Sequence, residues 1–384
     1  MNTFPRLLTS CCFVAACLVS SSDGMAISSS KSSKKKLLTN ARQGGSGGFG
    51  TSQPTLVHIP CTSSKSQTLI NFLLNQKSTG MNGETQIGFN ADTGLRGLYA
   101  CKNMKKGEII CKIPSDCALA LSDPGLGGDD VPTIAHEGRN FLLMYQQELD
   151  AQMLWAPYLD TLPSRNDASF NPSPDFWSDE EIEQLEFPRA VAGAKERKSE
   201  IAAVAAIEED MSFDDLQFGT WIVSSRSFQI QMSGSDDTSG GPGAVDDKGR
   251  AIAKPHKSIR VLLPYLDMAN HDSDNANSEL HLIDPEKDDA WFAIRATRPI
   301  AAGKEITLSY GSGIHSSVEI LLKYGFVPSE NKIDAIMLER SIEGSIETLD
   351  EWKTTLEEDL EAVKTAEGSM KSILQLRIKL KQAY

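Results

Sequence analysis

The chain has 384 residues, of which 40% are hydrophobic and 23% are charged. This composition is typical of a globular protein and excludes a wholly disordered or fibrous chain, and the length is enough for two or three domains. The formal net charge is −14. A general nucleic-acid binder that neutralises phosphate backbones is therefore excluded, and no nucleic-acid partner is expected.

The charge is divided unevenly along the chain. Residues 1–83 carry eight basic side chains and one acidic one, whereas the other 301 residues carry 30 basic and 51 acidic ones. Arg6 precedes an apolar run at residues 11–19, and residues 24–83 contain no acidic side chain. These features predict a signal peptide followed by a transit-like stretch, which indicates a plastid reached through the secretory route. Simple secretion, or a cytoplasmic protein with a basic tail, is the alternative.

Residues 24–66 are rich in Ser, Gly and Lys. We therefore expect residues 1–66 to form a targeting leader and a disordered segment. No stretch is long and apolar enough to be a transmembrane helix, so no stable membrane insertion is expected. No two cysteines have C-x-x-C spacing, and a structural zinc site has no support.

The first expected elements are a short helix at residues 67–76 and two strands at residues 94–101 and 108–113. The turn at residues 105–107 is expected to join these strands as a hairpin. The pattern then becomes helical, with a helix at residues 141–153. Capping boxes at Ser178 and Ser212 open two more helices. Together, these helices predict a helical insert over about residues 118–220.

A flexible loop rich in Ser and Gly is predicted at residues 233–250. Strand patterns return at residues 259–263, 290–296 and 305–310. A capping box at Thr348 then predicts one helix, and a second at residues 370–381 is expected to pack against it. The predicted domains are residues 67–328 and a short helical region at residues 329–384.

Two segments before residue 230 contain residues that suit ligand binding. Gly94 and Gly97 allow the backbone to approach a ligand, although a hairpin turn is the simpler interpretation. Arg226 lies in an apolar stretch and needs a partner, because a buried charge is costly without one. That partner is either a structural carboxylate or a ligand.

A third segment, around residues 263–272, places Asp267, Asn270 and His271 in an apolar run. Such groups need hydrogen bonds, which a polar core network or a ligand supplies equally well. A metal site is a further alternative, although the spacing matches no standard ligand set. It would be formed by His271, Asp272, Asp274 and His281. A fourth segment contains Tyr310 and, 14 residues later, Tyr324, and tyrosines at such places are usually packing residues.

Taken in order, these segments resemble the SET-domain protein methyltransferases, and within them the branch of the Rubisco large-subunit lysine methyltransferase. The resemblance covers about residues 67–384. The motifs that carry it are Gly94-Leu-Arg-Gly-Leu-Tyr-Ala, Trp155-Ala-Pro-Tyr-Leu-Asp-Thr-Leu-Pro163, Phe176-Trp-Ser-Asp-Glu-Glu-Ile, Ser225-Arg-Ser-Phe228, Pro264-Tyr-Leu-Asp-Met-Ala-Asn-His271, Ser309-Tyr-Gly311 and Glu319-Ile-Leu-Leu-Lys-Tyr-Gly-Phe326.

The resemblance implies an α+β fold: a mostly-β SET core with a pseudoknot, a helical insert within the SET domain and a short C-terminal helical region. It also implies S-adenosyl-L-methionine as cofactor. The residues implied to hold this cofactor are Gly94, Leu95, Arg226, Asn270, His271 and Tyr324. Tyr310 is implied to be catalytic, and the substrate lysine is implied to meet Phe228, Asp267, Tyr310 and Tyr324. No metal is implied.

The implied activity is protein-lysine N-methylation of a non-histone protein, by in-line transfer in a channel lined by tyrosines. Protein-histidine N-methylation is an alternative, and Phe228 favours lysine because the histidine-directed relative has a polar amide there. A SET-fold binding module without turnover is a second alternative. The sequence does not determine the oligomeric state, the substrate protein or the number of methyl groups added. At the position of Thr93, many relatives have a glutamate that contacts the cofactor. This chain departs from the family there.

Overall fold

The computed structural model describes residues 58–121, 133–165, 172–208, 210–232, 257–285, 287, 289–340 and 352–383. Residues 1–57 of the predicted leader and the predicted loop at residues 233–250 lie outside this part of the chain. The expectation of disorder up to residue 66 is wrong for its last residues. Strand β1 spans His58–Pro60 and helix α1 spans Ser64–Asn75. The N-cap Ser63 accepts a hydrogen bond from the Ser66 amide, and the Cys61 amide donates to the Ile87 carbonyl, which attaches this segment to the core.

A five-stranded sheet is central to the fold and has the order β1-β2-β3-β11-β8. Strands β3 and β11 are antiparallel, whereas β11 and β8 are parallel, with Asn270 opposite Thr307 and His271 opposite Leu308. Two three-stranded sheets accompany it, in the orders β4-β10-β9 and β5-β7-β6. The strands are β2 Thr85–Asn90, β3 Arg96–Ala100, β4 Ile109–Pro114, β5 Leu119–Ala120, β6 Phe228–Met232, β7 Lys257–Leu262, β8 Asn270–His271, β9 Ser278–Ile283, β10 Trp291–Ala296 and β11 Glu305–Leu308.

The predicted hairpin of residues 94–101 and 108–113 is wrong, although both strands exist. Strand β3 pairs with β2 and β11, whereas β4 pairs with β10 in another sheet. Between them, Met104 exchanges two backbone hydrogen bonds with Ile300, of 2.8 and 3.0 Å, and the Gly107 amide donates to the Ala296 carbonyl. The turn therefore carries the chain from one sheet to the next, because the long-range partners of each strand outcompete the local pairing.

The helical insert is present and extends beyond its predicted end. Helices α2 and α6 pack so closely that a Cβ at Gly138 would lie 2.6 Å from the Thr220 amide nitrogen, and one at Gly219 would lie 2.7 Å from the Gly138 carbonyl. The predicted end at residue 220 falls inside α6, which continues to Arg226. The helices are α2 Ile134–Ala151, α3 Ala156–Leu159, α4 Asp179–Glu183, α5 Pro188–Ala205 and α6 Phe213–Arg226.

The C-terminal region is helical, as predicted, and its first described helix is α8, Ile333–Arg340. The capping box predicted at Thr348 lies outside the described residues, and the helix α10 starts only at Leu356, where Thr355 and Glu358 form a capping box. Helix α11 packs against α10, α8 and α7. The helices are α7 Ser317–Tyr324, α8 Ile333–Arg340, α10 Leu356–Ala362 and α11 Gly368–Ala383.

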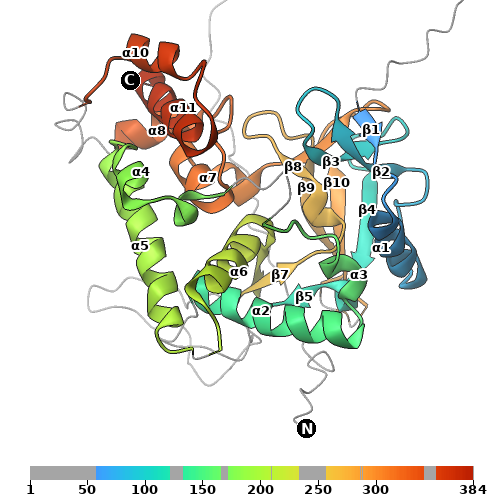
Figure 1. Cartoon of the computed structure of the whole chain (residues 1–384). Coiled ribbons are helices and arrows are strands. Elements are labelled where there is room, and N and C mark those ends of the chain that lie inside the picture. Colours follow the sequence, from blue (N-terminus) through green and yellow to red (C-terminus); the bar gives the residue numbers. More distant parts are fainter. Residues whose placement is uncertain are drawn as a thin grey trace, which may run out of the picture.

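The strands lie on one side of the molecule, and α4, α5 and the C-terminal helices lie on the other (Figure 1). The C-terminal helices share a hydrophobic cluster with the insert, in which Ile182 and Leu185 pack with Ile373 and Leu376. The main cluster joins the sheets with α1, α2 and α6 and contains Leu69, Phe141 and Ile222. The predicted domain limits stay predictions. Among the described helices, none is both long and apolar enough to span a membrane.

Candidate active site

Strands β8 and β11 end side by side and bring together the predicted site residues Asn270, His271 and Tyr310. The Tyr310 amide donates to His271 Nδ1 over 2.9 Å, and the Tyr310 hydroxyl donates to the Ala269 carbonyl over 3.0 Å. The ring centroids of His271 and Tyr310 lie 4.9 Å apart. The parallel pairing of Asn270–His271 with Thr307–Leu308 produces this meeting across 39 positions of sequence. The sheet therefore places His271 and Tyr310 in direct contact.

Aromatic rings extend the site beyond Tyr310. The centroids of Tyr310 and Tyr324 lie 4.7 Å apart, and Phe326 lies 5.9 Å from His271 and 6.3 Å from Tyr324. Tyr324 ends α7, where Gly325 adopts φ +82° and turns the chain so that Phe326 can return to the site. Burial raises the pKa of Tyr324 to about 12, and burial followed by the proximity of Tyr324 raises the pKa of Tyr310. Both hydroxyls are therefore protonated at neutral pH.

His271 is a neutral imidazole with both ring nitrogens engaged. Nδ1 accepts from the Tyr310 amide, so the proton is on Nε2, which lies 2.7 Å from the Ser273 hydroxyl. Burial lowers the pKa of His271 to about 4. The side chain thus positions Tyr310, and any contact of His271 with a cofactor is left to its backbone.

Asn270 is held by two acceptors on neighbouring strands. Its Nδ2 donates to the Arg96 carbonyl over 2.8 Å and to Glu305 Oε1 over 2.7 Å. Burial raises the pKa of Glu305, and the hydrogen bond from Asn270 opposes this shift. Gly97 makes the arrangement possible, since a Cβ there would lie 2.4 Å from Glu305 Oε1 and 2.8 Å from Asn270 Nδ2.

A buried ion pair lies at the end of α6. Arg226 Nη1 lies 3.1 Å from Asp267 Oδ2, and the Asp267 side chain is fully buried in a turn of 3-10 helix, Leu266–Met268. The Tyr158 hydroxyl donates to the same oxygen over 2.8 Å. Although burial opposes its charge, the Asp267 carboxylate raises the pKa of Arg226. Among the described residues, Arg226 Nε and Asp267 Oδ1 are buried without a hydrogen-bond partner, and such atoms are available to a ligand.

The other predicted residues lie at the margin of this site. Gly94, with φ +69°, and Leu95, which is 54% exposed, form the turn between β2 and β3. Their connection to the site is through Arg96, whose carbonyl accepts from Asn270. Phe228 begins β6 and packs against the main hydrophobic cluster. Neither Leu95 nor Phe228 has a ring contact or hydrogen bond with Tyr310 in the described structure.

The alternative metal site is not assembled. Within the described ranges, no three side chains of His, Cys, Asp or Glu are grouped so that they could hold a metal ion. Asp272 accepts from the Asn275 amide, and Asp274 accepts from the Lys332 amide. These local bonds and the engaged ring of His271 explain three of the four polar residues, His271, Asp272 and Asp274, as parts of the fold.

Sequence reasoning missed three contributors to the site: Tyr158, Arg96 and Glu305. Tyr158 lies in the Trp155-Ala-Pro-Tyr-Leu motif, which indicated the family but no role. Arg96 and Glu305 lie in strands whose pairing was not predicted, so no local signal identified them.

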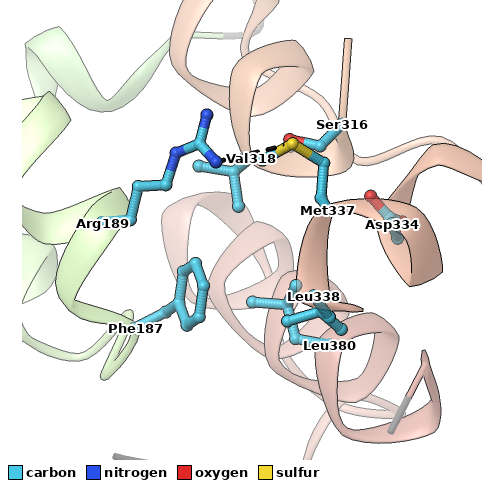
Figure 2. Close-up of a pocket in the computed structure, with 8 residues that line it drawn as sticks. All are labelled: Phe187, Arg189, Ser316, Val318, Asp334, Met337, Leu338 and Leu380. Atoms are coloured by element: carbon cyan, nitrogen blue, oxygen red, sulfur yellow. Dashed lines mark hydrogen bonds between the residues drawn. The ribbon is translucent and has the colours of Figure 1, made fainter. Parts of the chain in front are cut away.

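The pocket in Figure 2 is a separate feature. Phe187 and Arg189 at the start of α5 face Val318 of α7 and Leu338 of α8 across it, with Leu380 of α11 beneath. The Arg189 guanidinium reaches Met337 Sδ and pairs with Glu319. Because none of the predicted site residues lines this pocket, it is a seam between the insert and the C-terminal helices.

The SET domain family matches residues 95–311, which is more than half of the chain. The chain therefore belongs to the SET domain family, and its fold is that of a SET-domain methyltransferase.

Among individual proteins, the chain is similar to Protein SET DOMAIN GROUP 40 of Arabidopsis thaliana, with 25% identity over 283 residues. The match covers 64% of this chain and 53% of that protein, so the chain spans about half the length of this relative. Two similar solved structures are the SET domain of LSMT bound to lysine and AdoHcy, with TM-score 0.58 and 13% identity, and Rubisco LSMT bound to AdoMet, with TM-score 0.56 and 14% identity. Each covers 84% of this chain and 90% of the matched chain. At these identities the likeness is one of fold, and it agrees with the predicted α+β SET architecture.

Proposed function

We propose that this protein is an S-adenosyl-L-methionine-dependent protein-lysine N-methyltransferase acting on a non-histone protein. The observation that carries the proposal is the cluster of Tyr310, Tyr324 and neutral His271 beside the Arg226–Asp267 pair, in a SET fold. The similar LSMT structures, bound to lysine and AdoHcy or to AdoMet, support the same assignment.

The residues present fit the cofactor, which supplies an activated methyl group on a sulfonium sulfur when it is bound. The buried, unpartnered Nε–H of Arg226 suits an anionic group such as the cofactor carboxylate. The side chains of Asn270 and His271 are engaged within the protein, so these residues would contribute backbone groups. Gly94, Leu95 and Tyr324 would complete the cofactor site.

The lysine end requires an uncharged amine. At pH 7 the neutral form of a lysine with pKa about 10.4 costs roughly 4 to 5 kcal/mol. An aromatic lining of Tyr310, Tyr324 and Phe228 disfavours the ammonium by excluding water. Tyr310 keeps its proton because burial raises the pKa of its hydroxyl, so we assign it the role of orienting the amine rather than of removing a proton. Asp267 would complete the lysine site.

The test uses the purified full chain, isotopically labelled S-adenosyl-L-methionine, and poly-L-lysine or poly-L-histidine as acceptor. We expect labelled lysine, and we expect Tyr310→Phe to reduce kcat by about 100-fold or more, a loss typical of removing a group that acts in the transition state. Tyr145→Phe is the matched control, because Tyr145 lies in α2 and packs on Phe141 outside the site. Labelled histidine would replace the lysine assignment. Cofactor binding without transfer by the wild type would favour the binding module.

The plastid address is a separate proposal that rests on the composition of residues 1–66. Residues 1–66 fused to a fluorescent protein should direct it to plastids in a cell whose plastids are reached through the secretory route. Secretion of the fusion, or its retention in the cytoplasm, would contradict the proposal. Mass spectrometry of organelle and cytosolic extracts labelled by the enzyme would identify the substrate protein.

A further inference from the structure

Tyr158 connects the helical insert to the candidate lysine site. It belongs to α3, which the Trp155-Ala-Pro-Tyr-Leu motif forms, and it is fully buried. Its hydroxyl donates to Asp267 Oδ2 over 2.8 Å, across 109 positions of sequence. Burial, and then the Asp267 carboxylate, raise the pKa of Tyr158 well above its ordinary value of 10. The phenol therefore acts as a donor at every physiological pH.

The surroundings of Tyr158 hold it at both ends of its short helix. Before it, Trp155 Nε1 donates to the Cys117 carbonyl over 3.2 Å, and the Trp155 amide donates to Glu148 over 3.1 Å. After it, the Thr161 hydroxyl donates to the Tyr158 carbonyl over 2.7 Å, and Arg96 donates to the Thr161 carbonyl over 2.9 Å. A side chain so anchored can fix the position of the group to which it donates.

The two donors to Asp267 occupy one oxygen and leave the other open. Tyr158 and Arg226 both donate to Oδ2. In the described structure, Oδ1 is buried and has no hydrogen-bond partner. A buried polar atom left without a hydrogen bond is unfavourable. An N–H group of a ligand would relieve this cost.

We propose that Tyr158 is a positioning residue for the substrate lysine, and this inference rests on the proposed function. Tyr158 and Arg226 saturate Oδ2, so that Oδ1 is the acceptor for an N–H of the incoming amine. With that N–H bound, the amine no longer rotates freely about its C–N bond, and the lone pair is confined to the two remaining positions on nitrogen. Tyr158 itself touches neither the amine nor the cofactor, and acts only through Asp267.

The test compares Tyr158→Phe with Tyr145→Phe in the full chain, with poly-L-lysine as acceptor. We expect Tyr158→Phe to lower kcat/KM for poly-L-lysine by about 10- to 100-fold, as for the loss of a hydrogen bond to a charged group. Its Kd for S-adenosyl-L-methionine, measured by calorimetry, should stay within about twofold of wild type. Tyr145→Phe should match wild type in both measurements. A lower kcat/KM for poly-L-lysine with an unchanged Kd for S-adenosyl-L-methionine is a result that general destabilisation of the fold would not produce.

A double-mutant cycle tests whether Tyr158 acts through Asp267. In the Asp267→Asn background, Tyr158→Phe should lower kcat/KM by less than about threefold further. If Tyr158→Phe fails to fold, Thr161→Val is the second variant, because it removes the hydroxyl that donates to the Tyr158 carbonyl. It should lower kcat/KM in the same direction, by about two- to fivefold.

Three results would overturn the role of Tyr158. They are a Tyr158→Phe enzyme within twofold of wild type, an equal loss of cofactor affinity and acceptor turnover, and full additivity with Asp267→Asn. A wild-type enzyme that binds the cofactor and methylates only histidine, or nothing, would instead contradict the proposed lysine activity. The wild-type measurement thus separates the two failures.

Discussion

Gly97→Ala tests whether the packing between β3, β8 and β11 builds the candidate site. The added methyl group would lie 2.4 Å from Glu305 Oε1 and 2.8 Å from Asn270 Nδ2. At least one of these side chains must move, and the Asn270–Glu305 hydrogen bond of 2.7 Å is lost. That bond contributes about 1.5–3 kcal/mol, and overpacking adds about 1–3 kcal/mol. Alanine recovers about 0.4–1 kcal/mol by restricting the unfolded chain, so we expect a net destabilisation of about 1.5–5.5 kcal/mol.

The assay for Gly97→Ala combines urea unfolding with calorimetric titration of S-adenosyl-L-methionine. We expect the Kd for S-adenosyl-L-methionine to rise at least about tenfold. A displacement of Asn270 that weakens binding by about 1.4 kcal/mol is enough for a tenfold rise. Gly303→Ala is the control, because Gly303 has φ +81° but its Cβ would meet no atom within 4 Å. It should lower stability through backbone strain and leave the Kd unchanged. Wild-type stability and affinity in Gly97→Ala would show that close packing at Gly97 does not position Asn270 and Glu305.

Two further predictions concern stability. Arg377→Leu removes the buried guanidinium that pairs with Asp359 over 2.8 Å and Glu186 over 3.0 Å. The loss should be about 3–5 kcal/mol in urea unfolding, because Glu186 is left buried without this partner; a loss below 1 kcal/mol would contradict the assignment. Burial lowers the pKa of His271 from 6.5 to about 4, so the unfolded chain binds this proton first. Its contribution is complete above pH 6.5 and is lost as the pH falls toward 4. Between pH 7 and pH 5 the stability should fall by about 1–2 kcal/mol more in wild type than in His271→Asn, and equal pH dependence in the two proteins would show that His271 is not buried as described.

Local sequence signals identified α1, α2, α4, α6 and α11, whereas α3, α5, α7 and α8 were not predicted as separate helices. The apolar spacing of residues 67–76 predicted α1, and the capping box at Ser178 is formed as expected, with Ser178 and Glu181 each bonded to the other's backbone. These signals succeed because a cap or an amphipathic face involves residues only three or four positions apart. The capping box at Thr348 lies outside the described residues and stays a prediction, but the helix expected to follow it is not continuous, since residues 352–355 are not helical and a capping box at Thr355 opens α10.

The strands show the limit of such reasoning. The patterns of β3 and β4 were recognised, but their pairing was not, because each strand has a better partner far along the chain. Strands β2, β6 and β9 were not predicted. Their places depend on neighbours such as β3, β7 and β10, and a single strand pattern does not encode which neighbour it will meet.

The order of the motifs along the chain was sufficient to identify the family and to group Asn270, His271 and Tyr310. The role of each side chain in the site depends on long-range packing. This packing engages the His271 ring with Tyr310 and Ser273, and it brings Tyr158 to Asp267 across 109 positions. The physical reason is that propensity acts over one or two turns of chain, whereas the burial and hydrogen bonding of a polar group depend on whichever distant segment packs against it.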